Sequence, residues 1–459
     1  MSSRLRAALF APVDTASLIA FRVGFGLLML GATLRFVANG WVREHFLEPT
    51  FFFPYWGLGW IRPGPAWAMY GLYAVMGLAA LCVALGLLYR ASALLFFVTF
   101  TWAHFIDKTH WLNHYWLVTL VALLMGVLPL GRAGSIDVHL WPARRLESFP
   151  TWCLWLLRFQ FAVVYFFGGV AKLSHDWLVH AQPLTIWLGA HGDFPLLGGW
   201  LVKKSFAYAM SWLGAAFDLS VVFLLLGRRT RPFAYAAALG FHVMTSLLFQ
   251  LGMFPSIMLF GALLFFPPAW PRRLFARWLP PPPPPRPATG HEPANRVRGG
   301  PGTSHERRVM LALGAWALVQ VLLPLRHHLY PGPLGWREEG FRFAWNVMLV
   351  EKNGSVDFVA TEPSTGRRWV IAPEQYLTRY QAKMMATQPD MILQLAHRVA
   401  ADLEARGARD VEVRADAHVA WNGRPSAVFV DPHTDLAQER DTLAPKRWIA
   451  PAPTAPPRL

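Results

Sequence analysis

The sequence predicts a polytopic α-helical membrane protein, with about nine membrane helices and a C-terminal extracytoplasmic α+β domain. Composition gives the first reason: 54% of the 459 residues are hydrophobic and 15% are charged, whereas an ordinary soluble domain has about 25% charged residues. The formal net charge of +16 lies in short basic clusters between apolar runs, as in the loops of membrane proteins. We therefore expect membrane lipids, and no nucleic acid, as partners of this chain.

The second reason is a series of apolar runs close to the length that a membrane helix needs, about 20 residues. Nine runs occupy residues 15–37, 67–89, 91–106, 115–130, 151–172, 205–226, 232–250, 253–268 and 309–325. The runs at 91–106 and 253–268 are shorter, which suits tilted or partly re-entrant helices. The first run is longer than the apolar core of a cleavable signal peptide, so we expect it to be retained as a helix.

Basic residues predict the orientation of these helices. If the N-terminus lies inside, 17 lysine and arginine residues fall in inside segments and five fall in outside connections. The five are Arg43, Arg62, Lys108, Lys203 and Lys204. Because cytoplasmic loops are enriched in Lys and Arg, we expect a cytoplasmic N-terminus and an extracytoplasmic C-terminal domain in a bacterial inner membrane.

Changes in composition divide the chain into four regions. They are a membrane helical domain (1–268), a Pro/Arg-rich cytoplasmic linker (269–308), the last membrane helix (309–325) and an extracytoplasmic α+β domain (326–459). The linker contains six consecutive prolines, Pro280–Pro285. This run predicts a stiff polyproline segment, because proline cannot continue a helix or a central strand.

Turn signals and alternating apolar residues outline the last region. We expect short strands over 340–372, with turns at Asn353–Gly354 and Ser364–Gly366. A helical stretch over 374–406 and further strands over 410–431 follow, and Asn422–Gly423 is a dipeptide that a tight hairpin turn favours. Strands and helices alternate here in a way that predicts an α+β domain.

Ionisable side chains within apolar runs are costly to place in lipid, so each is a candidate for a functional role. They are Arg22, Arg35, His104, Arg158, Lys172, Asp218 and His242. Pairing among themselves, to fix helix packing, is the simpler interpretation for the three arginines and Asp218. Lys172 can instead extend to the outer interface, and for His104 and His242 a packing role and a functional role stay equally open.

Lys108 lies between two of the shorter apolar runs, in the segment FIDKTHWLNHYW at 105–116. Lysine is scarce in this chain, with seven residues against 36 arginines. Arginine would serve a structural charge equally well but cannot lose its proton, whereas a desolvated lysine can become a base. The residues alone leave two interpretations open: a catalytic base, or an interfacial lysine paired with Asp107.

Motifs for a metal or a protein-bound redox cofactor are weak. His110 and His114 are four residues apart, which would put both on one helix face, but no acidic third ligand stands at a usual spacing. The two cysteines, Cys82 and Cys153, lie inside apolar runs. The sequence has no strong metal motif and no haem-binding, phosphate-binding or dinucleotide-binding fingerprint, so we expect neither a metal nor a conventional redox cofactor held by the protein.

Seven segments, in order along the chain, resemble the vitamin K-dependent gamma-glutamyl carboxylase family. They are FRVGFGLLM (21–29), DKTHWLNH (107–114), LRFQFAVVYFFGGVAKLSHDW (157–177), FDLSVVFLL (217–225), FHVMTSLLFQLGMF (241–254), GFRFAWNVML (340–349) and VFVDPHTDL (428–436). The resemblance implies an enzyme that couples oxygenation of vitamin K hydroquinone, or of menaquinol, to carboxylation of peptide glutamate. The implied cosubstrates are the quinol, O₂ and CO₂, and the implied partners are a lipid-soluble quinone and a Glu-containing peptide or protein.

The resemblance also assigns roles to residues. In the family, a neutral lysine deprotonates the hydroquinone, and this position is Lys108 here. Trp111, Asn113, His114 and His242 match quinone-binding positions, and Trp345 matches an aromatic residue linked to glutamate binding.

Two departures from the family pattern accompany these matches. His110 replaces a small hydroxyl residue, and Val350 and Glu351 stand near the place of a family histidine. Two alternative functions therefore stand beside the carboxylase. One is a quinol epoxidase with a lost or different acceptor, and the other is a non-enzymatic lipid-binding or transport protein on the same fold.

Overall fold

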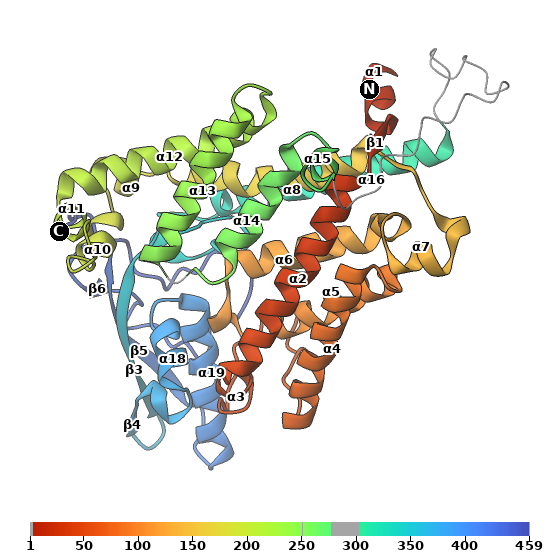
Figure 1. Ribbon diagram of the computed structural model, residues 1–459. Coiled ribbons are helices and arrows are strands. Elements are labelled where there is room, and N and C mark those ends of the chain that lie inside the picture. Colours follow the sequence, from red (N-terminus) through yellow and green to blue (C-terminus); the bar gives the residue numbers. More distant parts are fainter. Residues whose placement is uncertain (1–2, 250, 277–302, 459) are drawn as a thin grey trace, which may run out of the picture.

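The computed structural model describes residues 3–249, 251–276 and 303–458. A helical membrane part is followed by a domain that contains a β-sheet. Figure 1 shows the sheet and its two helices beside the lower ends of α2 and α4, away from the N-terminus. Fold class is therefore as the composition predicts: a mostly helical chain with a C-terminal sheet-containing domain.

Each of the nine predicted apolar runs is helical. The helices are α2 (Ala16–Ala38), α4 (Ala66–Leu85), α5 (Tyr89–Phe105), α6 (Asn113–Val127), α8 (Thr151–Ala171), α12 (Lys204–Leu226), α13 (Arg231–Leu248), α14 (Phe254–Ala262) and α16 (Ser304–Leu325). Among the described residues, α2, α4, α8, α12 and α16 are long and apolar enough to cross a membrane. The count of nine spans stays a prediction.

Close packing of the membrane helices depends on small residues where two backbones meet. Helices α2 and α4 pack along their length, and so do α4 with α5, α5 with α6, and α8 with α12. A Cβ atom on Gly26 of α2 would lie 2.5 Å from the backbone nitrogen of Ala84 in α4. Glycine at this position therefore lets the two helices approach, as is common in membrane helix pairs.

The charged side chains within the membrane part have two kinds of partner, other charged side chains and backbone carbonyls. Asp218 pairs with Lys172, whose Nζ lies 2.7 Å from its Oδ2. Arg22 donates to backbone carbonyls, among them that of Leu130 at 3.0 Å, and Arg158 donates to the carbonyl of Leu264 at 2.8 Å. Asp218 therefore pairs with another of these charged groups, as predicted. The same prediction is wrong for Arg22 and Arg158, because unpaired carbonyls at helix ends accept from their guanidinium groups instead.

Short elements connect the long helices. They are α1 (Ser3–Phe10), α3 (Trp41–Phe46), α7 (Ile136–Leu140), α9 (His175–His180), α10 (Leu184–Gly189), α11 (Gly198–Leu201), α15 (Trp270–Leu274), α17 (Leu334–Arg337), β1 (Pro12–Asp14) and β2 (Ser148–Pro150). The predicted polyproline run Pro280–Pro285 lies outside the described residues. Helix α16 begins at Ser304, before the predicted 309, because Thr303 and Glu306 form a capping box.

The C-terminal domain is an antiparallel sheet covered by helices. Its strands are β3 (Lys352–Glu362), β4 (Arg367–Ile371), β5 (Glu412–Trp421) and β6 (Ala427–Val428), in the order β4-β3-β5-β6, and its helices are α18 (Arg379–Met385) and α19 (Pro389–Ala405). Alternate residues of β5 are buried, which is the pattern of a sheet with one covered face. The predicted helical stretch is confirmed, as two helices separated by a short turn.

Turn predictions in this domain had mixed outcomes. Asn422 and Gly423 both have positive φ, +46° and +75°, and join β5 to β6 as predicted. Asn353–Gly354 is not a turn, because Gly354 pairs with Val419 inside the sheet. A Cβ on Gly354 would lie 3.0 Å from the carbonyl oxygen of Ala386, so glycine is needed for the helical layer to approach the sheet. Residues 340–351 are irregular rather than the predicted strand.

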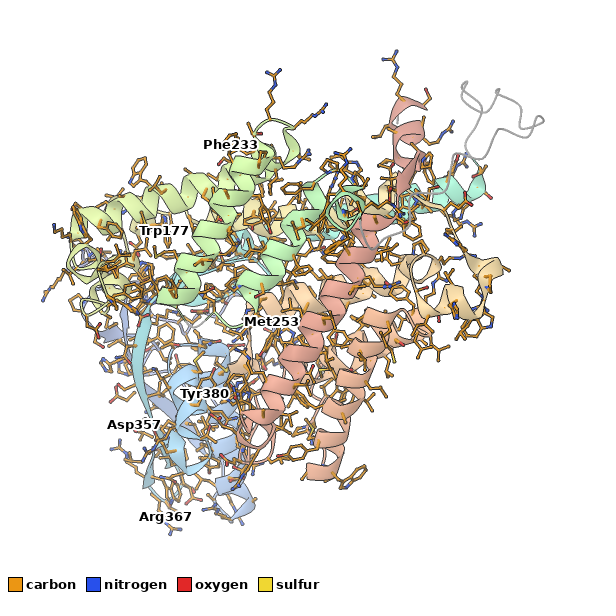
Figure 2. The ribbon with its side chains drawn as sticks, in the orientation of Figure 1. Trp177, Phe233, Met253, Asp357, Arg367 and Tyr380 are labelled. Atoms are coloured by element: carbon orange, nitrogen blue, oxygen red, sulfur yellow. The ribbon has the colours of Figure 1, made fainter. Side chains whose placement is uncertain are left out.

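A short segment after α3 joins the two parts of the molecule. Phe53 is fully buried in the hydrophobic core of the C-terminal domain. Gln381 of α18 donates to the carbonyl of Phe51 at 2.8 Å, and Gln394 of α19 donates to that of Pro54 at 3.1 Å. Figure 2 shows Tyr380, on α18, on the side of the domain that faces the membrane helices, whereas Arg367 lies at the far end. The sheet domain is thus packed on the helices through α18 and α19.

We expect the C-terminal domain to face outward. Ser364 lies exposed in the β3–β4 turn, so a cysteine there should react with a membrane-impermeant thiol reagent on intact cells. Arg229→Cys, in the exposed α12–α13 turn, is the matched control and should react only after the membrane is opened. Both variants would be made without Cys82 and Cys153. Protection of the Ser364→Cys protein in intact cells, with labelling of Arg229→Cys, would reverse the orientation.

Candidate functional site

Lys108 lies in a short turn between α5 and α6. Asp107 begins this turn, because its Oδ1 accepts a hydrogen bond from the backbone N–H of Thr109 at 2.9 Å. The backbone N–H of Lys108 donates to the carbonyl of Phe53 at 3.0 Å. These bonds hold the turn against the segment that enters the C-terminal domain, and the Lys108 side chain is only 4% exposed.

Asp107 is not the partner of Lys108. Its Oδ2 accepts a hydrogen bond from Gln381 at 2.7 Å. The predicted alternative, an ion pair between neighbouring residues, is therefore wrong. The Asp107 carboxylate is occupied by the backbone of its own turn and by α18, which leaves the Lys108 amine to a group from the C-terminal domain.

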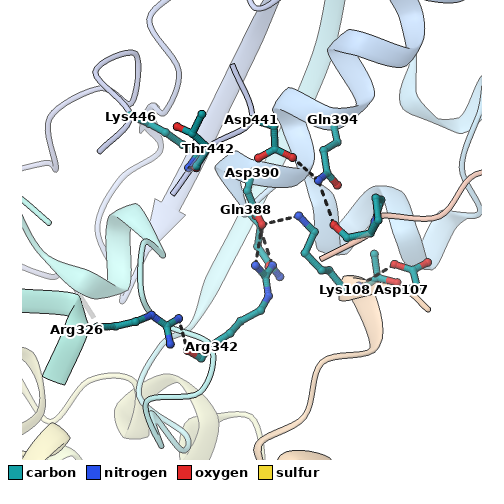
Figure 3. A network of polar contacts seen from close by, with 12 residues as sticks. Asp107, Lys108, Arg326, Arg342, Gln388, Asp390, Gln394, Asp441, Thr442 and Lys446 are labelled. Carbon is teal, nitrogen blue, oxygen red and sulfur yellow. Dashed lines mark hydrogen bonds and ion pairs between the residues drawn. The ribbon is translucent and has the colours of Figure 1, made fainter. Parts of the chain in front are cut away.

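That group is Asp390, at the start of α19. Lys108 Nζ lies 2.7 Å from Asp390 Oδ2, and Arg342 Nη1 lies 2.8 Å from the same oxygen. Arg342 also donates to Asp390 Oδ1 at 3.4 Å and to Gln388. Figure 3 shows the lysine and the arginine meeting at this one carboxylate. We call Lys108, Arg342 and Asp390 the charge triad.

Burial and the two neighbouring charges all influence the pKa of the Lys108 amine. Burial lowers the pKa of Lys108, the Asp390 carboxylate counteracts this, and the Arg342 charge lowers the pKa further, with a net lowering. For Asp390, burial opposes ionisation, but Arg342 and Lys108 together hold the pKa of this carboxyl well below its usual range. Asp390 thus stays ionised, and Arg342 still pairs with it when Lys108 gives up its proton.

The loop that carries Arg342 has an unusual backbone. Between residues 338 and 348, four residues other than glycine have positive φ: Glu338 (+60°), Phe343 (+66°), Trp345 (+58°) and Met348 (+55°). Such conformations cost free energy, of order 1–3 kcal/mol each for unfavourable residues, and persist where the surroundings enforce them. Strain concentrated in one loop is typical of functional sites.

Aromatic side chains of the membrane part enclose Phe343 of this loop. Its ring centroid lies 4.4 Å from that of Trp111, 4.8 Å from that of Trp116 and 6.1 Å from that of Phe105. These packed rings exclude water from the side of the loop next to Arg342. They also fix the position of Arg342, whose neighbour Phe343 cannot move without losing these contacts.

A cavity of about 380 Å³ opens beside the charge triad. Its apolar wall includes Tyr55, Phe105 and Leu323, and its polar wall includes Glu338, Glu339 and Asp441 besides the triad. Three further cations line it. Arg337 pairs with Glu339, whereas Arg326 donates to the carbonyl of Arg342 at 2.7 Å and Lys446 donates to that of Thr442 at 3.3 Å. Neither Arg326 nor Lys446 has a carboxylate within ion-pair distance among the described residues.

Two family models match the chain and together cover both of its parts. Residues 10–270 match the model of the HTTM domain, a membrane domain. Residues 305–455 match the lumenal domain of the vitamin K-dependent gamma-carboxylase. The chain belongs to the vitamin K-dependent gamma-carboxylase family. No solved structure matches it significantly.

Membership of the carboxylase family supports a carboxylase-like function and a membrane protein with a lumenal or extracytoplasmic domain. The charge triad joins the two matched regions, since Lys108 belongs to the HTTM domain and its two partners belong to the lumenal domain. In this chain, a lysine of the membrane domain and charged groups of the lumenal domain thus meet at one cavity.

In this carboxylase-family chain, the residues predicted to bind the quinone lie on three elements. Trp111 follows the turn that contains Lys108, Asn113 and His114 begin α6, and His242 lies in α13. Trp111 stacks on His104, and Asn113 donates to the backbone carbonyl of Asn346 at 3.1 Å. The rings of His114 and His242 both lie near the ring of Phe254, with centroids 6.0 and 6.2 Å from it. The backbone N–H of Trp111 donates to the carbonyl of Lys108 at 3.1 Å, whereas the Lys108 amine is bound to Asp390.

Several buried polar atoms in this region have no hydrogen-bond partner in the described part of the chain. They are Tyr55 Oη, both ring nitrogens of His104, Thr109 Oγ1, Trp111 Nε1, Asn113 Oδ1 and His242 Nδ1. Buried polar groups are normally paired, so each unpaired group calls for an explanation. A small molecule with an apolar ring and polar substituents could hydrogen-bond to such atoms, and a quinol has this composition.

Trp345 is placed differently from the prediction of a peptide-holding surface. It is 1% exposed and belongs to the hydrophobic core of the membrane part, and it does not line the cavity beside Lys108. The segment around it is irregular rather than a strand. Trp345 therefore anchors the strained loop, and any effect on an acceptor would pass through Arg342 and Phe343.

The histidines near Lys108 do not assemble into a metal site. Within residues 3–249, 251–276 and 303–458, no group of three His, Cys, Asp or Glu side chains could hold a metal ion. His110 instead stacks on His45, with centroids 3.9 Å apart, and on Tyr380 of α18. Burial lowers the pKa of His110 to about 4, so it is a neutral packing residue at ordinary pH.

The sequence does not indicate two members of the charge triad as site residues. Arg342 lies in the segment 340–349, where the family resemblance assigns a role to Trp345 alone. Asp390 follows Pro389 at the start of α19, where an acidic residue is ordinary because it stabilises a helix N-terminus. Its partner is 282 residues away, so the sequence contains no local signal for the contact.

Removal of the shared carboxylate should destabilise the folded protein. Asp390→Ala would leave the Lys108 and Arg342 charges buried without a counter-ion, which typically costs about 3–5 kcal/mol. Thermal unfolding of the purified protein would measure the loss. The matched control is Asp402→Ala, which removes the partly exposed Arg398–Asp402 pair of the same helix and should cost about 1 kcal/mol. Equal shifts for the two variants would contradict a structural role for the triad.

Proposed function

We propose that this chain oxygenates a reduced quinone, vitamin K hydroquinone or menaquinol, and couples that reaction to carboxylation of glutamate residues. The observation that carries the proposal is the buried Lys108 amine, which shares the Asp390 carboxylate with Arg342 at the edge of a cavity. The proposed partners are a lipid-soluble quinone and a Glu-containing peptide or protein. We further propose that the enzyme lies in a bacterial inner membrane, with the cavity near the outer interface.

Lys108 is proposed to act as a general base. When bound, the quinol supplies with O₂ the strong base that removes the γ-proton of glutamate, so that CO₂ can add to the carbon. Lys108 has to accept a proton from the quinol hydroxyl, which requires a neutral amine. Burial and the Arg342 charge both favour the neutral form, and a base is most effective when its pKa is near the working pH.

Arg342 is proposed to position Asp390 and to tune the lysine. If Lys108 and Asp390 formed an isolated pair, the attraction would hold the proton on the amine. Because Arg342 donates to both carboxylate oxygens, the carboxylate stays paired whether or not Lys108 is charged. The triad therefore lets Lys108 change charge at a smaller cost than an isolated buried pair would allow.

The aromatic surroundings are proposed to keep water from the reaction. Phe105, Trp111, Trp116 and Phe343 pack against one another beside the triad. A dry site strengthens electrostatic interactions and protects a strong base from being quenched by water. It also suits a quinone, whose ring is planar and apolar.

The quinol is proposed to bind among the unpaired polar groups of the membrane part. Trp111 Nε1 can donate, Asn113 Oδ1 can accept, and the ring nitrogens of His104 can do either according to tautomer. His114 and His242 both lie near the ring of Phe254, which supports their assignment to the same apolar site.

The acceptor glutamate is proposed to enter the cavity from the lumenal-domain side. Arg326 and Lys446 line the cavity without a carboxylate partner among the described residues. A guanidinium can hold a carboxylate through two parallel hydrogen bonds. Arg326 also lies over the ring of Phe343, 5.4 Å from its centroid, which supports a link between acceptor binding and the strained loop. Trp345 would act in this step by anchoring that loop.

A quinol epoxidase with a different acceptor is the second candidate. One observation favours it: Glu351 stands near the place of a family histidine, and its Oε2 accepts a hydrogen bond from Trp187 at 2.6 Å. A carboxylate at this position is held in a structural contact and leaves the acceptor site changed from the family pattern. An assay that follows both quinol epoxidation and incorporation of labelled CO₂ into a Glu peptide distinguishes the two activities.

Lys108→Arg should lose as much activity as Lys108→Ala. Arginine keeps the charge but cannot act as a base at ordinary pH, and loss of a general base typically lowers the rate about 10²–10⁴-fold. Both products should fall together, because the proposed proton transfer precedes reaction with O₂. The measurement is the rate of quinol epoxidation by protein shown to be folded. A Lys108→Arg enzyme that keeps more than about a tenth of the rate would remove Lys108 from the mechanism.

Substitutions of the two triad partners should move the pH profile in opposite directions. Arg342→Gln removes a charge that lowers the pKa of Lys108, so the rise of activity with pH should shift to higher pH. Asp390→Asn removes the charge that raises this pKa, so the rise should shift to lower pH. The measurement is kcat/KM for quinol against pH, with Arg337→Gln as a control that removes a different lining cation, one paired with Glu339. Identical profiles for all variants would contradict Lys108 as the titrating base.

A further inference from the structure

A second large cavity lies at the opposite end of the membrane helices from Lys108. It is formed by the first half of α2, the connection at 133–147, the region 260–264 and the short helix α15 with its flanking residues, and its volume is about 770 Å³. Figure 1 shows α15 and the start of α2 on the side away from the sheet domain. The volume is in the range of small-molecule binding sites.

One wall of this cavity is apolar. Ile19, Ala20, Val23 and Leu27 of α2 line it at the spacing of one helix face. The ring of Phe260 closes the other side, where it lies so near Gly24 that a Cβ on this glycine would be 1.9 Å from it. An aliphatic chain parallel to α2 would fit this wall, since α2 is itself long and apolar enough to cross a membrane.

Hydrogen-bond donors also line the cavity. Ser17, at the start of α2, is 2% exposed, and its hydroxyl has no partner among the described residues; Trp270 Nε1 is likewise buried without a partner. Arg145 lines the cavity, is exposed, and has no carboxylate within ion-pair distance in the described part of the chain. Indole and guanidinium nitrogens can only donate, so a ligand that accepts several hydrogen bonds would suit these groups.

The remaining donors narrow the class of ligand. Arg272 also lines the cavity; its charge is paired through Nε with Asp14 at 3.0 Å, but its outer nitrogens are left to donate further. Together with Arg145 and Trp270 it offers several N–H donors, which suits the oxygens of a phosphate. Pockets between membrane helices that carry basic side chains are typical sites for anionic lipid headgroups.

We propose that this cavity binds an anionic phospholipid. Its phosphate would accept hydrogen bonds from Arg145, Arg272 and Trp270, and one acyl chain would lie along α2 against Phe260. The lipid would fix α15 against the start of α2, at the end of the membrane part that is farthest from the charge triad. The inference is independent of the proposed reaction, because it requires no catalytic residue.

Native mass spectrometry of the full chain, released from vesicles of phosphatidylcholine with or without phosphatidylglycerol, tests the proposal. The wild-type protein should retain phosphatidylglycerol in preference to phosphatidylcholine. Arg145→Gln should weaken retention about fivefold, the equivalent of about 1 kcal/mol for one basic residue at a membrane surface. Ala20→Trp should abolish retention by filling the apolar wall.

Two matched variants control for charge and for size. Arg229→Gln removes an exposed arginine of the α12–α13 turn, and Leu213→Trp adds an indole at an exposed position of α12; both should retain the lipid as the wild type does. Equal retention by Arg145→Gln, Ala20→Trp and the wild type would overturn the site. Loss of both lipids in Ala20→Trp, without any preference in the wild type, would overturn headgroup recognition. Displacement of phosphatidylglycerol by inorganic phosphate alone would overturn the assignment to a lipid.

Discussion

The Asp390 carboxylate is the contact on which the site depends. It holds two cations, Lys108 from the membrane part and Arg342 from the loop that leads into the sheet domain. This half-buried carboxylate between two cations is ionised over the whole ordinary pH range, because each positive charge lowers its pKa. It fixes the lysine at the cavity and still leaves the arginine as a permanent partner, so the amine can change charge without leaving a buried anion uncompensated.

The same contact requires that two regions of the chain be packed precisely against each other. The segment 51–54 connects them: it accepts a hydrogen bond from Lys108 on one side and from α18 and α19 on the other. The strained loop at 338–348 adds aromatic packing around Phe343. Unfavourable backbone conformations in that loop are stabilised by burial of Phe343 and Trp345. Family membership explains why both regions occur in one chain, and the packing explains how they form one site.

Much of the architecture could be predicted because it depends on local patterns. Apolar runs predicted all nine helices, and Asn422–Gly423 predicted the β5–β6 turn, since positive φ at both residues favours this pair. The prediction failed at Asn353–Gly354, where close packing of the helical layer, rather than a turn, requires glycine. It also failed for Arg22 and Arg158, because backbone carbonyls at helix ends accept hydrogen bonds from arginine and give no signal in the sequence.

The sequence by itself determined the membrane class of the protein, the order of its two parts, and the unusual lysine at 108. Composition, the length of hydrophobic runs and the scarcity of lysine can be read directly from the sequence, without knowledge of which residues are in contact. Only the tertiary structure decided the partner of that lysine. Asp107 is adjacent in sequence but is occupied by its own turn and by Gln381, whereas Asp390 is 282 residues away and reaches the amine. The physical reason is that a buried charge pairs with whichever opposite charge the packing brings within reach, and distance along the chain does not limit that choice.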